Sequence, residues 1–236
     1  FSIEPPGRYR SYPSNLTASF DWRSRHNENW MTAVKDQGQC GSCWIFSTLG
    51  SVEALVNLYF NQHLDLDLSE QDLLSCSNTG NCISGGYLLP AMEYAARDGV
   101  VDEACLPYQA SDLVYCSGKC SNPAELVKIG GEIKHFPYLQ DGLEDEVKRM
   151  LIENGPLVVG VRTMRHAMVL VGYSVENGKT VWIFKNSWGP KMHENGYLKM
   201  FSPVSNVSSV ASSISSCLGV LPSIILRLAS SRISFI

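Results

Sequence analysis

The stretch QGQCGSCWIFS, residues 37–47, places two cysteines three positions apart and continues directly into apolar residues. After Trp44 the apolar positions recur at steps of four and three residues, which is the spacing of one face of an α-helix. That face consists of Ile45, Leu49, Val52, Val56 and Tyr59. A second apolar face, made of Phe46, Leu55 and Leu58, predicts that the helix is buried on most sides.

Cys43 stands where this predicted helix begins, and its position makes it the candidate reactive thiol. A free thiol has a pKa of about 8.5, so it is mostly protonated near neutral pH and is then a poor nucleophile. The unpaired N–H groups and the positive dipole end at a helix N-terminus favour the thiolate. Cys40 lies outside this field, in a polar turn, and is free to form a disulfide elsewhere.

The spacing of the two cysteines has two other interpretations, a redox-active pair and half of a zinc site. A redox motif is expected to follow a buried strand, but residues 35–39 are polar. A zinc site needs a second half, which Cys116 and Cys120 could supply. The two cysteines alone leave these alternatives open.

The composition is typical of a globular protein, with 236 residues, 44% apolar and 18% charged, and a formal net charge of −4. The lack of a basic run argues against nucleic acid or an anionic membrane as the main partner. Eight cysteines suit an oxidising compartment, and Asn15 and Asn206 stand in N-glycosylation motifs. Because the chain opens on Phe1 without a basic start and an apolar stretch, we expect a processed or fragmentary form of a secreted or endomembrane protein.

Helical patterns precede strand patterns along the chain, which favours an α+β fold with two lobes. A capping-box motif at residues 69–72, a pattern at 87–98 and an amphipathic stretch at 143–154 predict three further helices. Strands are predicted at residues 157–161, 167–173 and 181–185. We expect a lead-in at 1–19, a domain at 20–200 that divides near 122/123 into a helical and a β-rich lobe, and a disordered serine-rich tail at 201–236.

A predicted hairpin around residues 176–178 brings two polar residues within reach of each other. If its turn centres on Asn177, Asn186 pairs opposite Met168, and His166 becomes its neighbour on the same face. A strict two-residue turn with unbroken pairing would put His166 and Asn186 on opposite faces. We therefore predict a longer or bulged loop.

Residues 40–44, CGSCW, resemble the active-site signature of papain and cathepsin cysteine peptidases, and Gln37 precedes Cys43 at that family's spacing. Other motifs that resemble the family are Phe20-Asp21-Trp22-Arg23, Leu68-Ser69-Glu70-Gln71, Gly85-Gly86, His166-Ala167, Val171-Gly172-Tyr173 and Lys185-Asn186-Ser187-Trp188-Gly189. The resemblance spans about residues 20–200 and implies a papain-like fold with a cleft between the lobes. Together the motifs outweigh the redox and zinc interpretations.

The resemblance implies a catalytic role for four residues. Cys43 would attack the peptide carbonyl, and His166 would pair with the thiolate and then protonate the leaving amine. Asn186 would orient the imidazole, with Trp188 shielding their hydrogen bond from water. Gln37 would donate to the developing oxyanion together with the backbone N–H of Cys43.

The resemblance also implies an extended polypeptide substrate. The residues that would bind it are Gly85, Gly86, Tyr87, Leu88, Gly160, Ala167 and Trp188. The pocket for the second residue before the cut is expected to be small and apolar, which predicts an apolar preference there. No cofactor and no metal are expected.

The resemblance pairs Cys40 with Cys82 and Cys76 with Cys116, while Cys105 and Cys120 are candidates for one more bridge. We expect a monomer in a secreted, lysosomal or vacuolar setting. Its own pro-segment and cystatin-like inhibitors are expected partners, and nucleic acid and membranes are not.

Two departures from the family pattern concern the β-rich lobe. Only four residues separate Val161 from His166, where the family carries a longer strand-and-loop segment. After Met200 the serine-rich tail replaces the expected final strands, and Cys217 is expected to be unpaired. A sheet that lacks strands would expose an apolar edge. Because part of the β-rich lobe is expected to be missing, the alternative is that the protein is a catalytically impaired member of the family and binds peptides or inhibitors without cleaving them.

Overall fold

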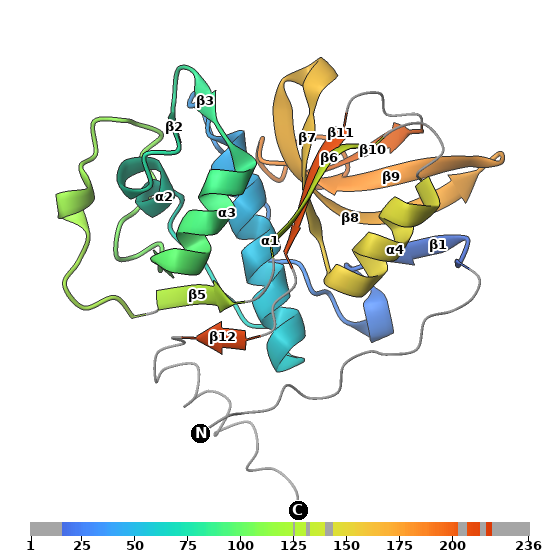
Figure 1. Cartoon of the computed structure of the whole chain (residues 1–236), viewed down its shortest axis with the longest axis horizontal. Helices are drawn as coiled ribbons and strands as arrows, with labels where there is room; N and C mark the ends of the chain where they lie inside the picture. The colour runs from blue at the N-terminus through green and yellow to red at the C-terminus, as the bar shows by residue number, and fades with distance from the viewer. Residues whose placement is uncertain are drawn as a thin grey trace, which may run out of the picture.

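Helices gather on one side of the molecule and most strands on the other (Figure 1). The computed structural model describes residues 16–124, 126–130, 133–139, 144–202, 207–212 and 216–218. The helical side contains α1 (Cys43–Phe60), α2 (Glu70–Cys76) and α3 (Leu88–Arg97), and the strand-rich side contains α4 (Glu144–Asn154). This is the α+β division into two lobes that the order of helical and strand patterns predicts.

The long helix α1 runs through the interior of the helical lobe and is buried along most of its length, as predicted. By length and composition it could cross a membrane, but 78% of its apolar window is buried inside the protein. The core helix of a globular domain has this property as well. Because α1 also packs against β8 of the other lobe, its first turn lies where the two lobes meet.

The remainder of the helical lobe consists of short elements around α1. Ser69 caps α2, since its Oγ accepts a hydrogen bond from the Asp72 N–H at 2.9 Å, as the capping motif predicts. A ribbon is formed by β2 (Gly80–Asn81) and β3 (Gly85–Gly86), and a three-stranded sheet has the order β12-β5-β4. Its strands are β4 (Val100–Val101), β5 (Leu126–Gly130) and β12 (Ser216–Leu218). Single 3-10 turns are η1 (Arg25–Asn27), η2 (Cys116–Gly118) and η3 (Arg162–Met164).

The β-rich lobe is built on an antiparallel sheet of seven strands in the order β10-β9-β8-β7-β11-β6, with β1 paired to β8 beside this path. The strands are β1 (Ser19–Asp21), β6 (Ile133–Leu139), β7 (Leu157–Val161), β8 (His166–Glu176), β9 (Lys179–Lys185), β10 (Tyr197–Phe201) and β11 (Val207–Ser212). The predicted strands near residues 157, 167 and 181 correspond to β7, β8 and β9.

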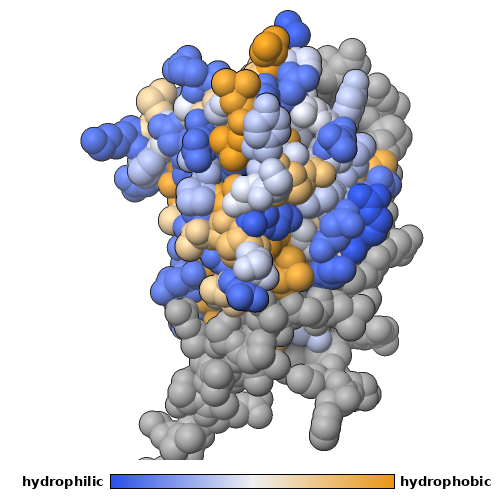
Figure 2. All heavy atoms as spheres, turned by 90° about the vertical axis from the view of Figure 1, so that its left-hand side faces the viewer, coloured by the Kyte–Doolittle hydropathy of each residue, from blue (hydrophilic) through white to orange (hydrophobic). Residues whose placement is uncertain are grey.

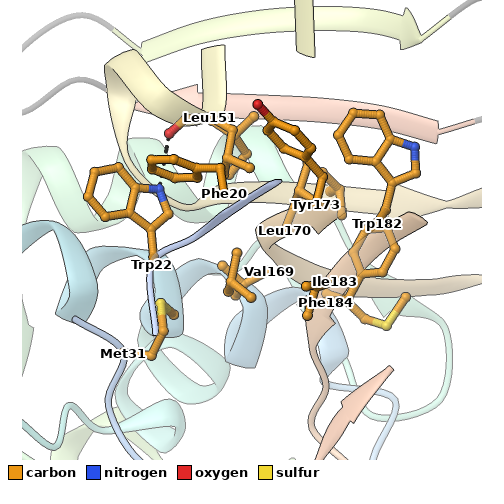
Figure 3. Packing of buried hydrophobic residues seen from close by; sticks show 14 of the residues in the cluster. Phe20, Trp22, Met31, Leu151, Val169, Leu170, Tyr173, Trp182, Ile183 and Phe184 are labelled. Atoms are coloured by element: carbon orange, nitrogen blue, oxygen red, sulfur yellow. Dashed lines mark hydrogen bonds between the residues drawn. The ribbon is translucent and has the colours of Figure 1, made fainter. Parts of the chain in front are cut away.

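An aromatic core holds this sheet against α4 and the chain around β1 (Figure 3). Tyr173 and Leu151 are fully buried in it, and the Trp22 indole N–H donates to the Leu151 carbonyl at 3.0 Å. Phe20 lies edge-to-face with Trp22. Burial of large aromatic side chains is a major source of stability. The strands β8 and β9 are therefore held in place by a tightly packed core.

The β8–β9 hairpin has a two-residue turn, so the predicted longer loop is wrong. Glu176 pairs with Lys179, and Asn177 and Gly178 both have positive φ, as a tight hairpin turn requires. The pairing is nevertheless broken further along, where the register shifts between Leu170 and Gly172. This bulge brings Lys185 opposite Val169, so Asn186 follows on the same face as His166. The predicted relation of these two residues is confirmed, although the extra residue lies in the strand and not in the turn.

The serine-rich tail is not a disordered appendage where the structure describes it. Residues 207–212 form β11, which lies between β7 and β6, and residues 216–218 form β12 beside β5. The remaining residues of the predicted tail after residue 202 lie outside the described part, as does most of the lead-in at 1–19. Because β11 pairs with residues 158–161 of β7 and with β6, this part of the sheet does not have the exposed edge that missing strands were expected to leave.

The predicted boundary near residue 122 is crossed in both directions. Phe20 and Trp22, near the start of the domain, belong to the core of the β-rich lobe. Val127 and Ile129, in β5, belong to the core of the helical lobe. The helical lobe thus contains a segment from after residue 122, and the β-rich lobe contains a segment from before it. The chain therefore crosses between the lobes more than once, which connects them.

A cluster of charged side chains, most of them buried, joins the two lobes beside Gly50 and Glu53 in the middle of α1. The Lys35 ammonium lies 3.2 Å from a carboxyl oxygen of Glu53, 2.9 Å from one of Glu70 and 2.6 Å from one of Asp67. From the β-rich lobe, the Lys185 ammonium donates to the Thr32 hydroxyl at 3.0 Å, and that hydroxyl donates to Glu53. Burial raises the pKa of Glu70 to about 8, against the opposing effect of Lys35.

The Glu70 carboxyl gives the fold a pH dependence that can be measured. Between pH about 4.5 and 8 the folded protein keeps a proton on Glu70 that the unfolded chain has lost, so the free energy of unfolding falls as pH rises. We expect Glu70→Gln to remove this contribution, so that the Tm of the wild type falls about 3–6 °C more than that of the variant between pH 5 and 8. Thermal unfolding followed by circular dichroism measures the difference, and the exposed Glu28→Gln is the matched control. Parallel pH curves for wild type and Glu70→Gln would contradict this assignment.

Candidate active site

Cys43 is the first residue of α1, and its thiol is partly buried. Burial raises the pKa of this thiol, whereas hydrogen bonds from the backbone of Ala167, Trp44 and Cys43 itself lower the pKa. The last two come from the first turn of α1, which is the direction of effect that the sequence argument for the helix N-terminus expects. Of the cysteines among residues 16–124, it alone is not in a disulfide.

His166 begins β8 and forms a buried hydrogen bond with Asn186, which follows β9. The His166 Nε2 lies 2.7 Å from the Asn186 Oδ1, and the two residues are only 8% and 4% exposed. The same Oδ1 accepts from the Ser187 N–H at 2.8 Å, which fixes the orientation of the amide and identifies Nε2 as the protonated nitrogen of the ring. The Trp188 ring lies against the imidazole, with 4.5 Å between the ring centroids. Burial lowers the pKa of His166, and the bond to Asn186 opposes this shift.

The thiol and the imidazole lie on elements that meet at the lobe junction. Cys43 comes from the helical lobe and His166 from the β-rich lobe, where α1 packs against β8. The backbone of Ala167, the residue that follows His166, is among the groups that lower the pKa of the Cys43 thiol. The residues expected to act as nucleophile, base and orienting group therefore lie on α1, at the start of β8 and directly after β9.

Gln37 is buried and is held by hydrogen bonds from three sides. Its Nε2 donates to the Cys40 carbonyl at 2.9 Å, and its Oε1 accepts from the Ser187 hydroxyl at 2.7 Å. Its carbonyl accepts from the Tyr108 hydroxyl at 2.9 Å. An amide nitrogen has two hydrogens, so one N–H of Gln37 remains for a ligand.

The expected substrate-binding residues come from both lobes. Gly160 and Ala167 are direct partners in the β7–β8 pairing. Gly86 lies so close to Trp44 that an added Cβ would come within 2.4 Å of the indole ring, so no side chain fits there. Leu88 packs against the helical core, while Tyr87 at the start of α3 is 75% exposed. On the β-rich lobe, Gly160 and Ala167 are thus neighbours in the sheet. On the helical lobe, Gly85 and Gly86 form β3, which contacts α1.

The outer face of the helical lobe mixes apolar and polar side chains (Figure 2). Ile83, Leu113 and Tyr115 are large, strongly exposed side chains of this lobe. They were not singled out by the motifs of the sequence, and they belong to surface loops and not to the thiol–imidazole site.

The disulfides decide between the interpretations of the paired cysteines. Cys40 is bonded to Cys82, and the other two bridges are Cys76–Cys116 and Cys105–Cys120. Cys40 and Cys43 are therefore not a redox pair. Cys116 and Cys120 are not free to form half of a zinc site either. The side chain of Cys217 lies outside the described part, so its unpaired state stays an expectation.

Two residues of the site were missed by the sequence analysis. Ser187 was quoted only as part of a motif, although its hydroxyl and backbone hold Gln37 and Asn186 in place. Tyr108 carried no local signal, because its role depends on a loop that returns to the start of α1.

Comparison with known families identifies the chain over most of its length. Residues 16–165 and 161–218 match the family model of papain family cysteine proteases. The two matched ranges overlap at residues 161–165, which contain η3 between β7 and β8. The match also includes β11 and β12, in agreement with their place in the two sheets.

Similar proteins include cathepsins and plant proteases. The chain is 34% identical to a viral cathepsin of Cydia pomonella granulosis virus, covering 78% of this chain and 57% of the relative. It is 36% identical to chymopapain of Carica papaya, covering 79% of this chain and 55% of the relative. It is 32% identical to cathepsin S of Bos taurus, covering 86% of this chain and 66% of the relative. The chain therefore spans only about half to two thirds of the length of these relatives.

Solved structures with the same architecture include digestive procathepsin L 3 of Tenebrio molitor, with a TM-score of 0.69 at 30% identity over 89% of this chain and 74% of that chain. Bromelain of Ananas comosus in complex with the E64 inhibitor has a TM-score of 0.66 at 26% identity over 84% of this chain and all of that chain. With the family model matched from residue 16 to residue 218, the chain belongs to the papain family of cysteine proteases.

Proposed function

We propose that this chain is the catalytic domain of a cysteine endopeptidase, which cleaves peptide bonds with Cys43 as nucleophile and His166 as general acid and base. The observation that carries the proposal is the buried His166–Asn186 hydrogen bond at 2.7 Å, together with a free thiol at the N-terminus of α1, the helix that packs against β8. Family membership supports hydrolysis of peptide bonds by a cysteine protease.

The proposed resting state is a thiolate paired with an imidazolium. Burial alone favours the neutral forms, because it raises the pKa of Cys43 and lowers the pKa of His166. Transfer of the proton from sulfur to nitrogen creates two opposite charges in contact, and their attraction offsets the loss of hydration. The N–H groups at the start of α1 stabilise the thiolate, and the Asn186 oxygen stabilises the imidazolium.

The reaction then follows from the positions of the groups. The thiolate attacks the carbonyl carbon, and the carbonyl oxygen becomes an oxyanion that accepts from the free N–H of Gln37 and the backbone N–H of Cys43. His166 gives its proton to the leaving amine, which leaves a thioester on Cys43. His166 next removes a proton from water as that water attacks the thioester, and the acid product and the thiolate are released.

The proposed substrate is an extended polypeptide with an apolar residue at the second position before the cut. Leu88, Gly160 and Ala167 are the apolar or small residues proposed to accept it, and Gly86 leaves room for the substrate backbone because no side chain fits there. Tyr87, Gly85 and Trp188 would complete the surface around the cleft. We propose that the domain extends beyond residue 200 to include β11 and β12.

The setting of the protein is also a proposal. Three disulfides and relatives that include cathepsins support a secreted, lysosomal or vacuolar location. Procathepsin L 3 of Tenebrio molitor is a proform, which supports a pro-segment as a natural partner of the cleft. We propose that the domain acts as a monomer.

Titration with a peptidyl epoxide such as E64 tests the proposal. We expect one equivalent to react, mass spectrometry to place the adduct on Cys43, and peptide hydrolysis to disappear in parallel. Cys43→Ala should abolish both labelling and turnover, while Cys43→Ser should abolish labelling and keep the fold. A folded wild type that neither reacts nor hydrolyses peptides would refute the proposal and favour a peptide-binding relative.

A further inference from the structure

Tyr108 connects the two groups that are proposed to bind the oxyanion, although it touches no reacting atom. It lies in the loop between β4 and η2. Its hydroxyl donates to the Gln37 carbonyl at 2.9 Å and lies 2.6 Å from the Ser42 hydroxyl. Gln37 supplies one proposed oxyanion donor, and Ser42 directly precedes Cys43, which supplies the other.

The direction of these hydrogen bonds follows from a count of donors. A tyrosine hydroxyl has one hydrogen, and a carbonyl can only accept, so that hydrogen belongs to the contact with Gln37. The Ser42 hydroxyl must then donate to the Tyr108 oxygen. Burial raises the pKa of Tyr108 to about 12, so the phenol keeps its hydrogen throughout the neutral and acidic range.

Ser42 does not cap the helix with its side chain, although serine commonly does so at a helix N-terminus. It is the N-cap residue of α1, but its side chain makes no capping hydrogen bond. A capping oxygen would accept from an N–H of the first turn, which is where the Cys43 thiol accepts. The contact with Tyr108 instead fixes the residue that directly precedes Cys43.

Tyr108 is itself held firmly, as a positioning group must be. Its ring lies edge-to-face with Phe46 of α1, with 4.9 Å between the ring centroids. Its backbone N–H donates to a Glu103 carboxylate oxygen at 2.7 Å. On the opposite side, Ser187 fixes Gln37 from the β-rich lobe through a backbone bond at 2.9 Å and a side-chain bond at 2.7 Å. Gln37 is thus fixed from both lobes.

We propose that Tyr108 is a positioning residue for the oxyanion site, whose hydroxyl sets the distance between the Gln37 amide and the backbone N–H of Cys43. The inference rests on the proposed peptidase function. A donor that is displaced loses much of its effect on the transition state, because that effect depends on donors held in place beforehand. The thiolate itself should not depend on Tyr108.

Tyr108→Phe tests this inference, because it removes the hydroxyl and keeps the ring. We expect kcat for a fluorogenic peptide to fall about tenfold, with KM unchanged within about twofold. The rate of alkylation by iodoacetamide, which needs the thiolate but no oxyanion donor, should stay within about twofold of the wild type. Tyr115→Phe is the matched control, since Tyr115 is 76% exposed and should leave all three values unchanged.

Ser42→Ala provides an independent measurement. It should also lower kcat without slowing alkylation, and the double variant with Tyr108→Phe should lose little more than either single variant, because both act through one contact. Unchanged kcat in both single variants, or an equal loss of turnover and alkylation, would overturn the inference. If Tyr108→Phe does not fold, the result for Ser42→Ala decides. A wild type that is neither alkylated nor active would refute the proposed function itself, which is a different outcome.

Discussion

His166→Ala should lower kcat/KM by about 10⁴-fold or more, because one residue is proposed to stabilise the thiolate and to protonate the leaving amine. Without the imidazolium, burial leaves the Cys43 thiol with a raised pKa, so the thiolate should form only in alkaline solution. Alkylation by iodoacetamide reports this directly. We expect the wild type to react at acidic and neutral pH, and the variant to react appreciably only in alkaline solution.

The matched control for this experiment is His193→Ala. The His193 ring lies near Trp188, with 6.0 Å between the ring centroids, but it makes no contact with Asn186 among the described residues. The activity and the alkylation profile of His193→Ala should stay close to those of the wild type. If His166→Ala kept more than a tenth of the activity, or if its alkylation profile matched the wild type, the ion pair would be ruled out.

Gln37→Ala should lower kcat by about 10²–10³-fold, the usual loss when one oxyanion donor is removed. The reason is geometric, because the Gln37 amide is fixed by Cys40 and Ser187 so that one N–H points to no protein acceptor. The donor acts on charge that develops only in the transition state, so KM should change little. Steady-state kinetics with a fluorogenic peptide measures the two parameters separately.

Gln39→Ala is the control from the same loop, since Gln39 is exposed and precedes the disulfide-bonded Cys40. It should retain wild-type kinetics. The alkylation rate of Gln37→Ala should also stay near the wild-type value, because the thiolate does not need the amide. A rise in KM with unchanged kcat would assign Gln37 to ground-state binding and contradict the proposed role.

The parts of the fold that the sequence predicts are those with local periodicity. The buried helix α1 follows from apolar residues at steps of three and four, and the pairing of β8 with β9 follows from two apolar runs around Asn177-Gly178. The position of the bulge was not predictable, since nothing near Val171 distinguishes a strand residue from a bulged one. That His166 and Asn186 share one face of the sheet was predictable. Their side chains lie on the same face only if the pairing of the two strands is shifted by one residue from that of an unbroken two-residue hairpin.

The serine-rich tail shows why other parts were missed. A run of serines with scattered apolar residues gives no strand signal, and β11 forms where β6 and β7 offer unpaired backbone on both sides. Tyr108 is a similar case at the site, because its neighbours Gln37 and Ser42 are distant in sequence. The three disulfides rest on resemblance and on the folded structure, since spacing alone does not determine cysteine pairing.

The place of β11 between β6 and β7 has a consequence for synthesis of the protein on the ribosome. The sheet cannot close until residues 207–212 have left the exit tunnel, and β1, made early, must wait for β8. During that interval the nascent chain presents bare strand edges to its surroundings, which are the surfaces that chaperones cover and that neighbouring polypeptides can capture.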